Sequence, residues 1–214
     1  SAGDIISMPT NMFRGFENAG DKEGLMFVVL GGDDPGIITW LPSVLEKAKE
    51  TGMALLNDNS LIDLSNEKVP MGKELLKPID LEEIKKFDDY KLDELSQFIC
   101  KFENRKNFEQ EISPGLFLVQ ILGNNFNDQN FDPIINQNTG FNLSLLKAKK
   151  CNIENIKFDK PTILFSQNGD WKVKIDNTEI YLKPKDTFSV PVNSNLTIEI
   201  DEQQDCFLNC VSQI

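Results

Sequence analysis

The stretch TILFSQNGDWKVKI, residues 162–175, places two apolar runs on either side of a polar turn. The turn Gln167-Asn168-Gly169-Asp170 is of the kind that joins antiparallel strands, because Asn and Gly tolerate left-handed backbone conformations. The flanking runs, Thr162 to Ser166 and Trp171 to Ile175, have the length of ordinary strands. This stretch therefore predicts a β-hairpin.

Further short runs lie on both sides of this hairpin, with turn signals about every 8–12 residues, a spacing typical of a sandwich or barrel. The Asn-rich segment from Gly123 to Asn138 predicts a polar surface loop. We expect residues 111–214 to form one β domain. The additional strands expected in it are Phe117 to Leu122, Phe141 to Lys147, Ile153 to Phe158, Ile180 to Leu182, Phe188 to Val190, Leu196 to Ile200 and Cys206 to Val211.

Residues 41–110 favour helices. Pro42 and Ser43 followed by Glu46 predict a capped helix that ends before Gly52, and Asp80 with Glu83 predicts a second capping box. The apolar spacing from Leu81 to Tyr90, and again from Leu92 to Phe102, predicts two amphipathic helices. A small hairpin is expected between Ala54 and Leu64.

Residues 1–40 are strand-like, with runs from Ile5 to Met8 and from Leu25 to Leu30. Two such strands cannot bury both of their faces alone. The predicted organisation is thus a partial N-terminal sheet over residues 1–40, a helical linking region over residues 41–110 and a β domain over residues 111–214.

Composition excludes several classes of function. The net charge of −12, from 34 acidic and 22 basic residues, disfavours nucleic acid as a partner. No apolar run approaches the length of a membrane span, so no membrane association is expected. The four cysteines form no CxxC pair and are expected to be buried apolar groups, which favours the reducing cytoplasm. The absence of histidine rules out Ser-His-Asp and Cys-His catalysis.

Residues 3–18 resemble the second conserved motif of the cupin superfamily, a family of jelly-roll barrels. Gly3, Pro9 and Asn18 stand at the spacing of its Gly, Pro and Asn, and Arg14 stands where that motif has a metal-binding histidine. The segment from Lys183 to Leu196 is similar to the same motif more loosely. There Asp186 and Pro191 match, Lys185 replaces the Gly and Leu196 takes the ligand position.

The first cupin motif, normally two His and a Glu before a Gly such as Gly169, is missing, since its ligand positions fall among Asn155, Lys157 and Thr162. Two motif copies imply a bicupin-like, N-terminally incomplete chain whose metal ligands are not retained. The expected fold is mainly β, with a cupin-type jelly-roll barrel at the C-terminus and a partial cupin sheet at the N-terminus. An α-helical insert is expected between them.

The resemblance implies three alternatives for function. The first is a metal-free cupin-family protein without a cofactor, which serves structure, dimerisation as a homodimer or small-ligand binding. The second is a fragment of a metal-dependent bicupin dioxygenase or isomerase whose ligands lie in missing upstream sequence. The third is a module that binds a sugar or an acid without catalysis. The chain as given is expected not to be an enzyme.

The candidate ligand-binding residues are Arg14, Asn18 and Trp40. A guanidinium can clamp a carboxylate through two parallel hydrogen bonds, which makes Arg14 the best candidate for a small carboxylate or sugar-like ligand. Asn18 could assist it, and Trp40 could line the same pocket. An alternative for Arg14 is an ion pair with Glu17 or another acid.

Overall fold

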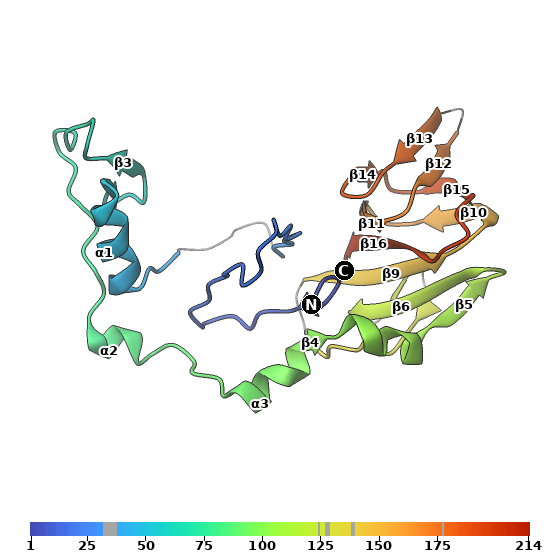
Figure 1. The fold of residues 1–214 in the computed structure, drawn as a ribbon, viewed down its shortest axis with the longest axis horizontal. Helices are drawn as coiled ribbons and strands as arrows, with labels where there is room; N and C mark the ends of the chain where they lie inside the picture. The colour runs from blue at the N-terminus through green and yellow to red at the C-terminus, as the bar shows by residue number, and fades with distance from the viewer. Residues whose placement is uncertain (32–37, 124, 127–128, 138–139, 177) are drawn as a thin grey trace. The chain divides into compact units, whose positions relative to one another are not determined.

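The structure is a computed structural model that describes residues 1–31, 38–123, 125–126, 129–137, 140–176 and 178–214. The chain forms two compact units. One unit consists of Ser1–Met8 together with Lys91–Ile214, and the other consists of Pro9–Tyr90. The chain thus leaves the first unit after Met8 and returns to it at Lys91 (Figure 1). These boundaries differ from the predicted ones at residues 40 and 110.

The first unit contains two large antiparallel sheets (Figure 1). The six-stranded sheet has the order β14 (Thr187–Val190), β11 (Thr162–Asn168), β16 (Cys206–Gln213), β9 (Phe141–Ala148), β6 (Leu116–Leu122) and β5 (Gln110–Ser113). The four-stranded sheet has the order β10 (Cys151–Phe158), β15 (Ser194–Ile200), β12 (Trp171–Ile175) and β13 (Thr178–Leu182). Each strand predicted between residues 117 and 211 is present, with ends within two residues of the expected ones.

The strands from β9 to β16 are connected as a jelly roll. When these eight strands are numbered in chain order, the six-stranded sheet contains the order 6-3-8-1 and the four-stranded sheet has the order 2-7-4-5. Successive strands therefore cross between the two sheets, as in a double Greek key, except that β12 and β13 form a hairpin within one sheet. The hairpin predicted over residues 162–175 is wrong, because β11 and β12 lie in different sheets and the turn at Gly169 joins the two sheets. The prediction of a mainly β chain with a jelly-roll barrel at its C-terminus is confirmed. Strands β5 and β6 extend the six-stranded sheet beyond the jelly roll.

Alternation along the strands builds the core between the two sheets. In β12, Trp171 and Val173 are buried in the core, whereas Lys172 and Lys174 lie on the opposite face. In β15, Leu196 is likewise buried, together with the other inward-facing residues of that strand. Each large apolar side chain buried in this way stabilises the fold by about 1.5–3 kcal/mol.

The N-terminal segment packs on the outer face of the six-stranded sheet. Strand β1 (Ile5–Ile6) pairs with β4 (Ile99–Cys100), and the 3₁₀ helix η2 (Phe102–Phe108) follows. The Phe102 ring contacts the Phe207 ring of β16, with centroids 5.2 Å apart. Gly3 lies so close to Gln167 of β11 that a Cβ atom would be 2.7 Å from its amide nitrogen, and its φ of +84° also favours glycine.

The second unit has a small hydrophobic core. It contains α1 (Pro42–Glu50), the hairpin of β2 (Met53–Leu55) and β3 (Leu61–Asp63), and α2 (Leu81–Ile84). The capping box of Asp80 and Glu83 and the hairpin are confirmed. The predicted cap at Ser43 is wrong, since α1 begins at Pro42 with Leu41 as its N-cap. The residues of the small core are Ala54, Leu56, Ile62 and the partly buried Leu75.

The two amphipathic helices predicted over residues 81–90 and 92–102 are shorter than expected. Only α2, α3 (Leu92–Leu95) and the 3₁₀ turn η1 (Ser96–Phe98) form, and Ile99 already belongs to β4. Leu81 and Leu92 are exposed, so they are not packed against a core. Because short helices depend on tertiary packing, these segments do not extend further.

The partial N-terminal sheet is reduced to strand β1. Residues 9–31 and 38–40 contain no helix or strand, and the Gly-rich turn at residues 32–37 lies outside the described residues. The apolar run Leu25–Leu30 is largely exposed, and no strand of the described residues pairs with it. A strand forms only with a hydrogen-bonded neighbour, which explains why strand-like composition alone does not produce one here. Among the described residues, no helix is long and apolar enough to cross a bilayer.

Candidate functional site

The positions in the jelly roll that resemble cupin metal ligands are either filled by an apolar side chain or lie outside the core. Leu196 is 0% exposed and belongs to the hydrophobic core. Asn155 and Lys157 are exposed, because a bulge between Ile153 and Ile156 shifts the strand and gives Asn155 a φ of 60°. The bulge packs Ile156 against the core instead.

Polar side chains inside this sandwich are satisfied by hydrogen bonds within the chain. Ser144 donates from its hydroxyl to Oε1 of Gln120 at 2.7 Å, and Nε2 of Gln120 donates to the carbonyl oxygen of Leu122 at 2.6 Å. Thr162, at the position that resembles the cupin glutamate, donates to the carbonyl oxygen of Lys160 at 3.1 Å. These three buried side chains thus have the hydrogen-bond partners that buried polar groups need, and their role is structural.

Two aromatic side chains from the segment between β6 and β9 also enter the core. Phe126 and Phe131 are buried there, and the ring of Phe126 lies edge-on to that of Phe158, with centroids 5.9 Å apart. The prediction of a polar surface loop in this segment is therefore wrong at Phe126 and Phe131, which pack inside. Asn124, Asn127, Asp128, Asn138 and Thr139 lie outside the described residues.

The described residues contain no group of three or more His, Cys, Asp or Glu that could hold a metal ion. The prediction that the cysteines are small buried apolar groups holds for Cys206 and Cys210, which lie in the core. Burial raises the pKa of the Cys206 thiol to about 11. Neither thiol is therefore ionised near neutral pH, and neither is suited to act as a nucleophile.

The three predicted site residues lie in the second unit. Arg14 is exposed, and no ion pair or hydrogen bond joins it to the rest of the described chain, Glu17 included. Asn18 is exposed and closes a local turn, where it donates to the carbonyl oxygen of Lys22 at 2.7 Å and accepts from the Gly20 amide at 3.1 Å. Trp40 is 36% exposed. No contact joins these three side chains to one another within the described residues.

The second arginine of the chain, Arg105 in η2, is buried on the outer face of the six-stranded sheet. It is 2% exposed, and its Nη2 atom donates to the carbonyl oxygen of Gly3. Its Cζ atom lies 5.2 Å from the centroid of the Phe102 ring. Its Nε and Nη1 atoms have no hydrogen-bond partner among the described residues. Sequence reasoning missed Arg105, because the polar run around it resembles an exposed segment.

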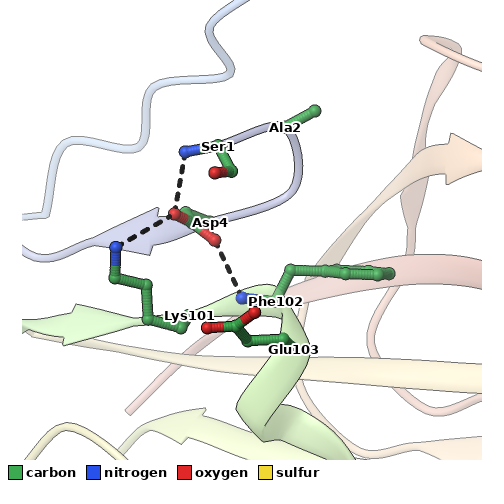
Figure 2. A pocket seen from close by; sticks show the side chains of 6 residues that line it. All are labelled: Ser1, Ala2, Asp4, Lys101, Phe102 and Glu103. Carbon is green, nitrogen blue, oxygen red and sulfur yellow. Dashed lines mark hydrogen bonds and ion pairs between the residues drawn. The ribbon is translucent and has the colours of Figure 1, made fainter.

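A cavity of about 140 Å³ lies between the N-terminal segment and the start of η2, and Phe102 is one of the residues that line it (Figure 2). Asp4 is central to it: the carboxylate accepts from the Ser1 ammonium and the Phe102 amide, each at 2.8 Å. The Nζ atom of Lys101 lies 3.8 Å from Oδ2 of Asp4. The hydrogen bonds from Ser1 and then Phe102 lower the pKa of Asp4. The remaining lining residues are Ala2 and Glu103.

Known proteins resemble this chain in structure but not in sequence. No family model matches the sequence, and no curated protein matches it. Similar solved structures include KdgF from Halomonas sp., 13% identical with a TM-score of 0.40 over 52% of this chain and 90% of that one. An RmlC-like cupin from Shewanella frigidimarina is 13% identical, with a TM-score of 0.40 over 53% of this chain and 87% of that one.

The EutQ protein of Clostridium difficile is also similar, at 9% identity and a TM-score of 0.39 over 56% of this chain and 89% of that one. Neither a shared activity nor membership of a family follows from identities and TM-scores this low. The jelly roll is established by the strand order itself.

Proposed function

We propose that this chain is a cupin-like scaffold protein that acts through its surface and self-associates as a homodimer. The observation that carries this proposal is the filled interior, in which Leu196 and the aromatic pair Phe126 and Phe158 occupy the space between the sheets. A close-packed interior leaves no room for a substrate. We therefore assign the function of the chain to its exposed surfaces.

The apolar run Leu25–Leu30 is the surface we assign to self-association. Leu25, Met26, Val28 and Leu30 are all at least half exposed. Contiguous exposed apolar residues mark interaction sites in soluble proteins. A run that is apolar on both faces is typical of a strand buried within a sheet, so its partner must supply both a strand edge and a covering layer.

A second copy of the chain fits this requirement. Two identical segments that pair in antiparallel fashion about a twofold axis satisfy each other's backbone groups with a single contact. Antiparallel pairing of residues 25–30 between two copies would supply the strand edge, and the other residues of the two second units would have to supply the covering layer. The homodimer is thus proposed to form through the second unit, while the jelly roll remains a closed scaffold.

Sedimentation equilibrium of the full chain tests this proposal. The double variant M26D/V28D places two charges on the proposed contact, at side chains that are 53% and 54% exposed. The matched control is M71D, at a fully exposed methionine of the same unit outside residues 25–30. We expect dimers for the wild type and for M71D and monomers for M26D/V28D, each with an unchanged far-UV circular dichroism spectrum. A monomeric wild type, or a dimeric M26D/V28D, contradicts the proposal.

The bicupin alternative, a metal-dependent dioxygenase or isomerase with upstream ligands, stays a prediction. In this alternative residues 3–18 belong to a first cupin barrel. Its test is the sequence that encodes any upstream segment, because an HxH motif followed by Glu there supports a metal centre. Transition metal bound in stoichiometric amount by the present chain, measured by mass spectrometry, would contradict the scaffold proposal.

A further inference from the structure

The buried guanidinium of Arg105 carries its charge without a carboxylate partner among the described residues. Burial of an unpaired cation is costly, so arginines in such places are normally bound to carboxylates or other oxyanions. The bond from Nη2 to the Gly3 carbonyl satisfies one donor of the group, and a neutral carbonyl does not neutralise the charge. The Nε and Nη1 atoms remain as two unused donors.

The groups around Arg105 do not replace an anion. Phe102 offers a ring face, and Cys100 is a buried thiol. Burial raises the pKa of Cys100, and the nearby Arg105 charge only partly offsets this effect, so the thiol stays neutral near pH 7. Asp4 is the neighbouring carboxylate, but it accepts from Ser1 and Phe102 instead of Arg105.

We propose that Arg105 binds a small oxyanion, of phosphate or carboxylate chemistry, beneath the N-terminal segment. The proposed route of access is the cavity beside Asp4, which Phe102 lines (Figure 2). Arg105 is not among the residues that line this cavity, but its guanidinium lies against the Phe102 ring. The charged groups at the cavity are the Ser1 ammonium and Lys101 against Asp4 and Glu103. Together with Arg105, these groups carry a net charge of one positive unit, which favours a ligand with one negative charge.

The choice of arginine supports binding over a purely structural role. The chain uses 20 lysines, the difference between 22 basic residues and two arginines, so arginine is rare in it. A guanidinium presents five N–H donors in a fixed plane and matches oxyanions better than an ammonium does. The proposed site is independent of self-association, because Arg105 and residues 25–30 belong to different units.

The experiment measures binding of inorganic phosphate to the full chain by equilibrium dialysis, with acetate as the carboxylate probe and sodium chloride at equal ionic strength as the background. The variants are R105M, which removes the donors, and R105K, which keeps the charge. The control is R14M, at the exposed arginine that the sequence alone favours. Circular dichroism establishes that each variant folds.

We expect saturable binding of at least one probe to the wild type and to R14M. Binding should be lost in R105M and about 10- to 100-fold weaker in R105K, the loss expected for charge-assisted hydrogen bonds. If R105M does not fold, the affinity of R105K for the probe tests the proposal alone. The proposal is overturned if neither probe binds the wild type saturably, if R105K binds as the wild type does, or if R14M rather than R105M loses binding.

Discussion

The ring of Phe126 meets the ring of Phe158 edge to face, with 5.9 Å between centroids, although β9 lies between the two residues in the sequence. Phe158 ends β10, whereas Phe126 follows β6 in a largely polar segment. This contact joins the connecting segment to the jelly-roll core. It accounts for the closed interior, because an aromatic side chain fills space that a polar loop would leave to solvent.

Removal of this ring should destabilise the chain. The substitution F126A is expected to lower the free energy of unfolding by about 3–5 kcal/mol, the usual cost of deleting a buried phenyl ring. The measurement is urea unfolding followed by circular dichroism. The control F16A alters an exposed phenylalanine of the other unit and should change stability by less than about 0.5 kcal/mol. Equal effects of the two substitutions would show that Phe126 is not packed.

A histidine placed at the ligand-like position should not create a metal site. In L196H the imidazole would replace a side chain that is 0% exposed and whose neighbours are apolar core residues. We expect the free energy of unfolding to fall by more than about 2 kcal/mol, since a buried polar group would lack partners. Mass spectrometry with added Zn²⁺ or Fe²⁺ should find no stoichiometric metal. Tight metal binding by L196H would mean that other donors converge there.

Acid should weaken the attachment of the N-terminal segment through Asp4. Its pKa is lowered in the folded chain by the Ser1 ammonium and the Phe102 amide. A lowered folded pKa means that this stabilisation is fully present above the unfolded value of about 3.9 and is lost as pH falls through the folded value. The variant D4N should therefore be less stable than the wild type at pH 6, and the difference should shrink below pH 4. A difference that is constant with pH contradicts this assignment.

The four cysteines should differ in reactivity. Burial raises the pKa of all four thiols, but Cys151 is partly exposed, whereas Cys100, Cys206 and Cys210 are buried. Ellman's reagent at pH 8 should label one thiol of the native chain first, and C151S should remove that phase. In urea all four thiols of the wild type should react. A fast phase that persists in C151S would place another thiol at the surface.

The jelly roll was predictable from the sequence because local and long-range signals agree in it. The turn at Gly169 ends one strand and begins the next, although it joins the two sheets instead of closing a hairpin. The alternation in β12 and the spacing of similar strand and turn signals lead to a sandwich. The second unit was less predictable. Leu25–Leu30 has strand composition but no partner strand in the described residues. The stripe that begins at Leu81 forms only the short helix α2, and Leu81 itself is exposed.

The candidate site was hardly predictable at all. The position of Arg14 in a cupin-like motif predicted a ligand-binding side chain, yet Arg14 is exposed. Arg105 lies in a polar run of η2, and its burial depends on Gly3 and Phe102. The burial of Arg105 depends on its contact with Gly3, about one hundred positions away in the sequence, and no local sequence pattern predicts such a contact. The entry of Phe126 into the core is of the same kind.

The central claim, a jelly-roll interior closed by packed side chains, is tested most directly by the fluorescence of Trp171. This residue is 0% exposed inside the sandwich, and the substitution W40F removes the other tryptophan. We predict that Trp171 in W40F emits at short wavelength and is barely quenched by acrylamide until the chain unfolds. Long-wavelength emission from the folded chain, quenched as readily as free tryptophan, would contradict a closed interior.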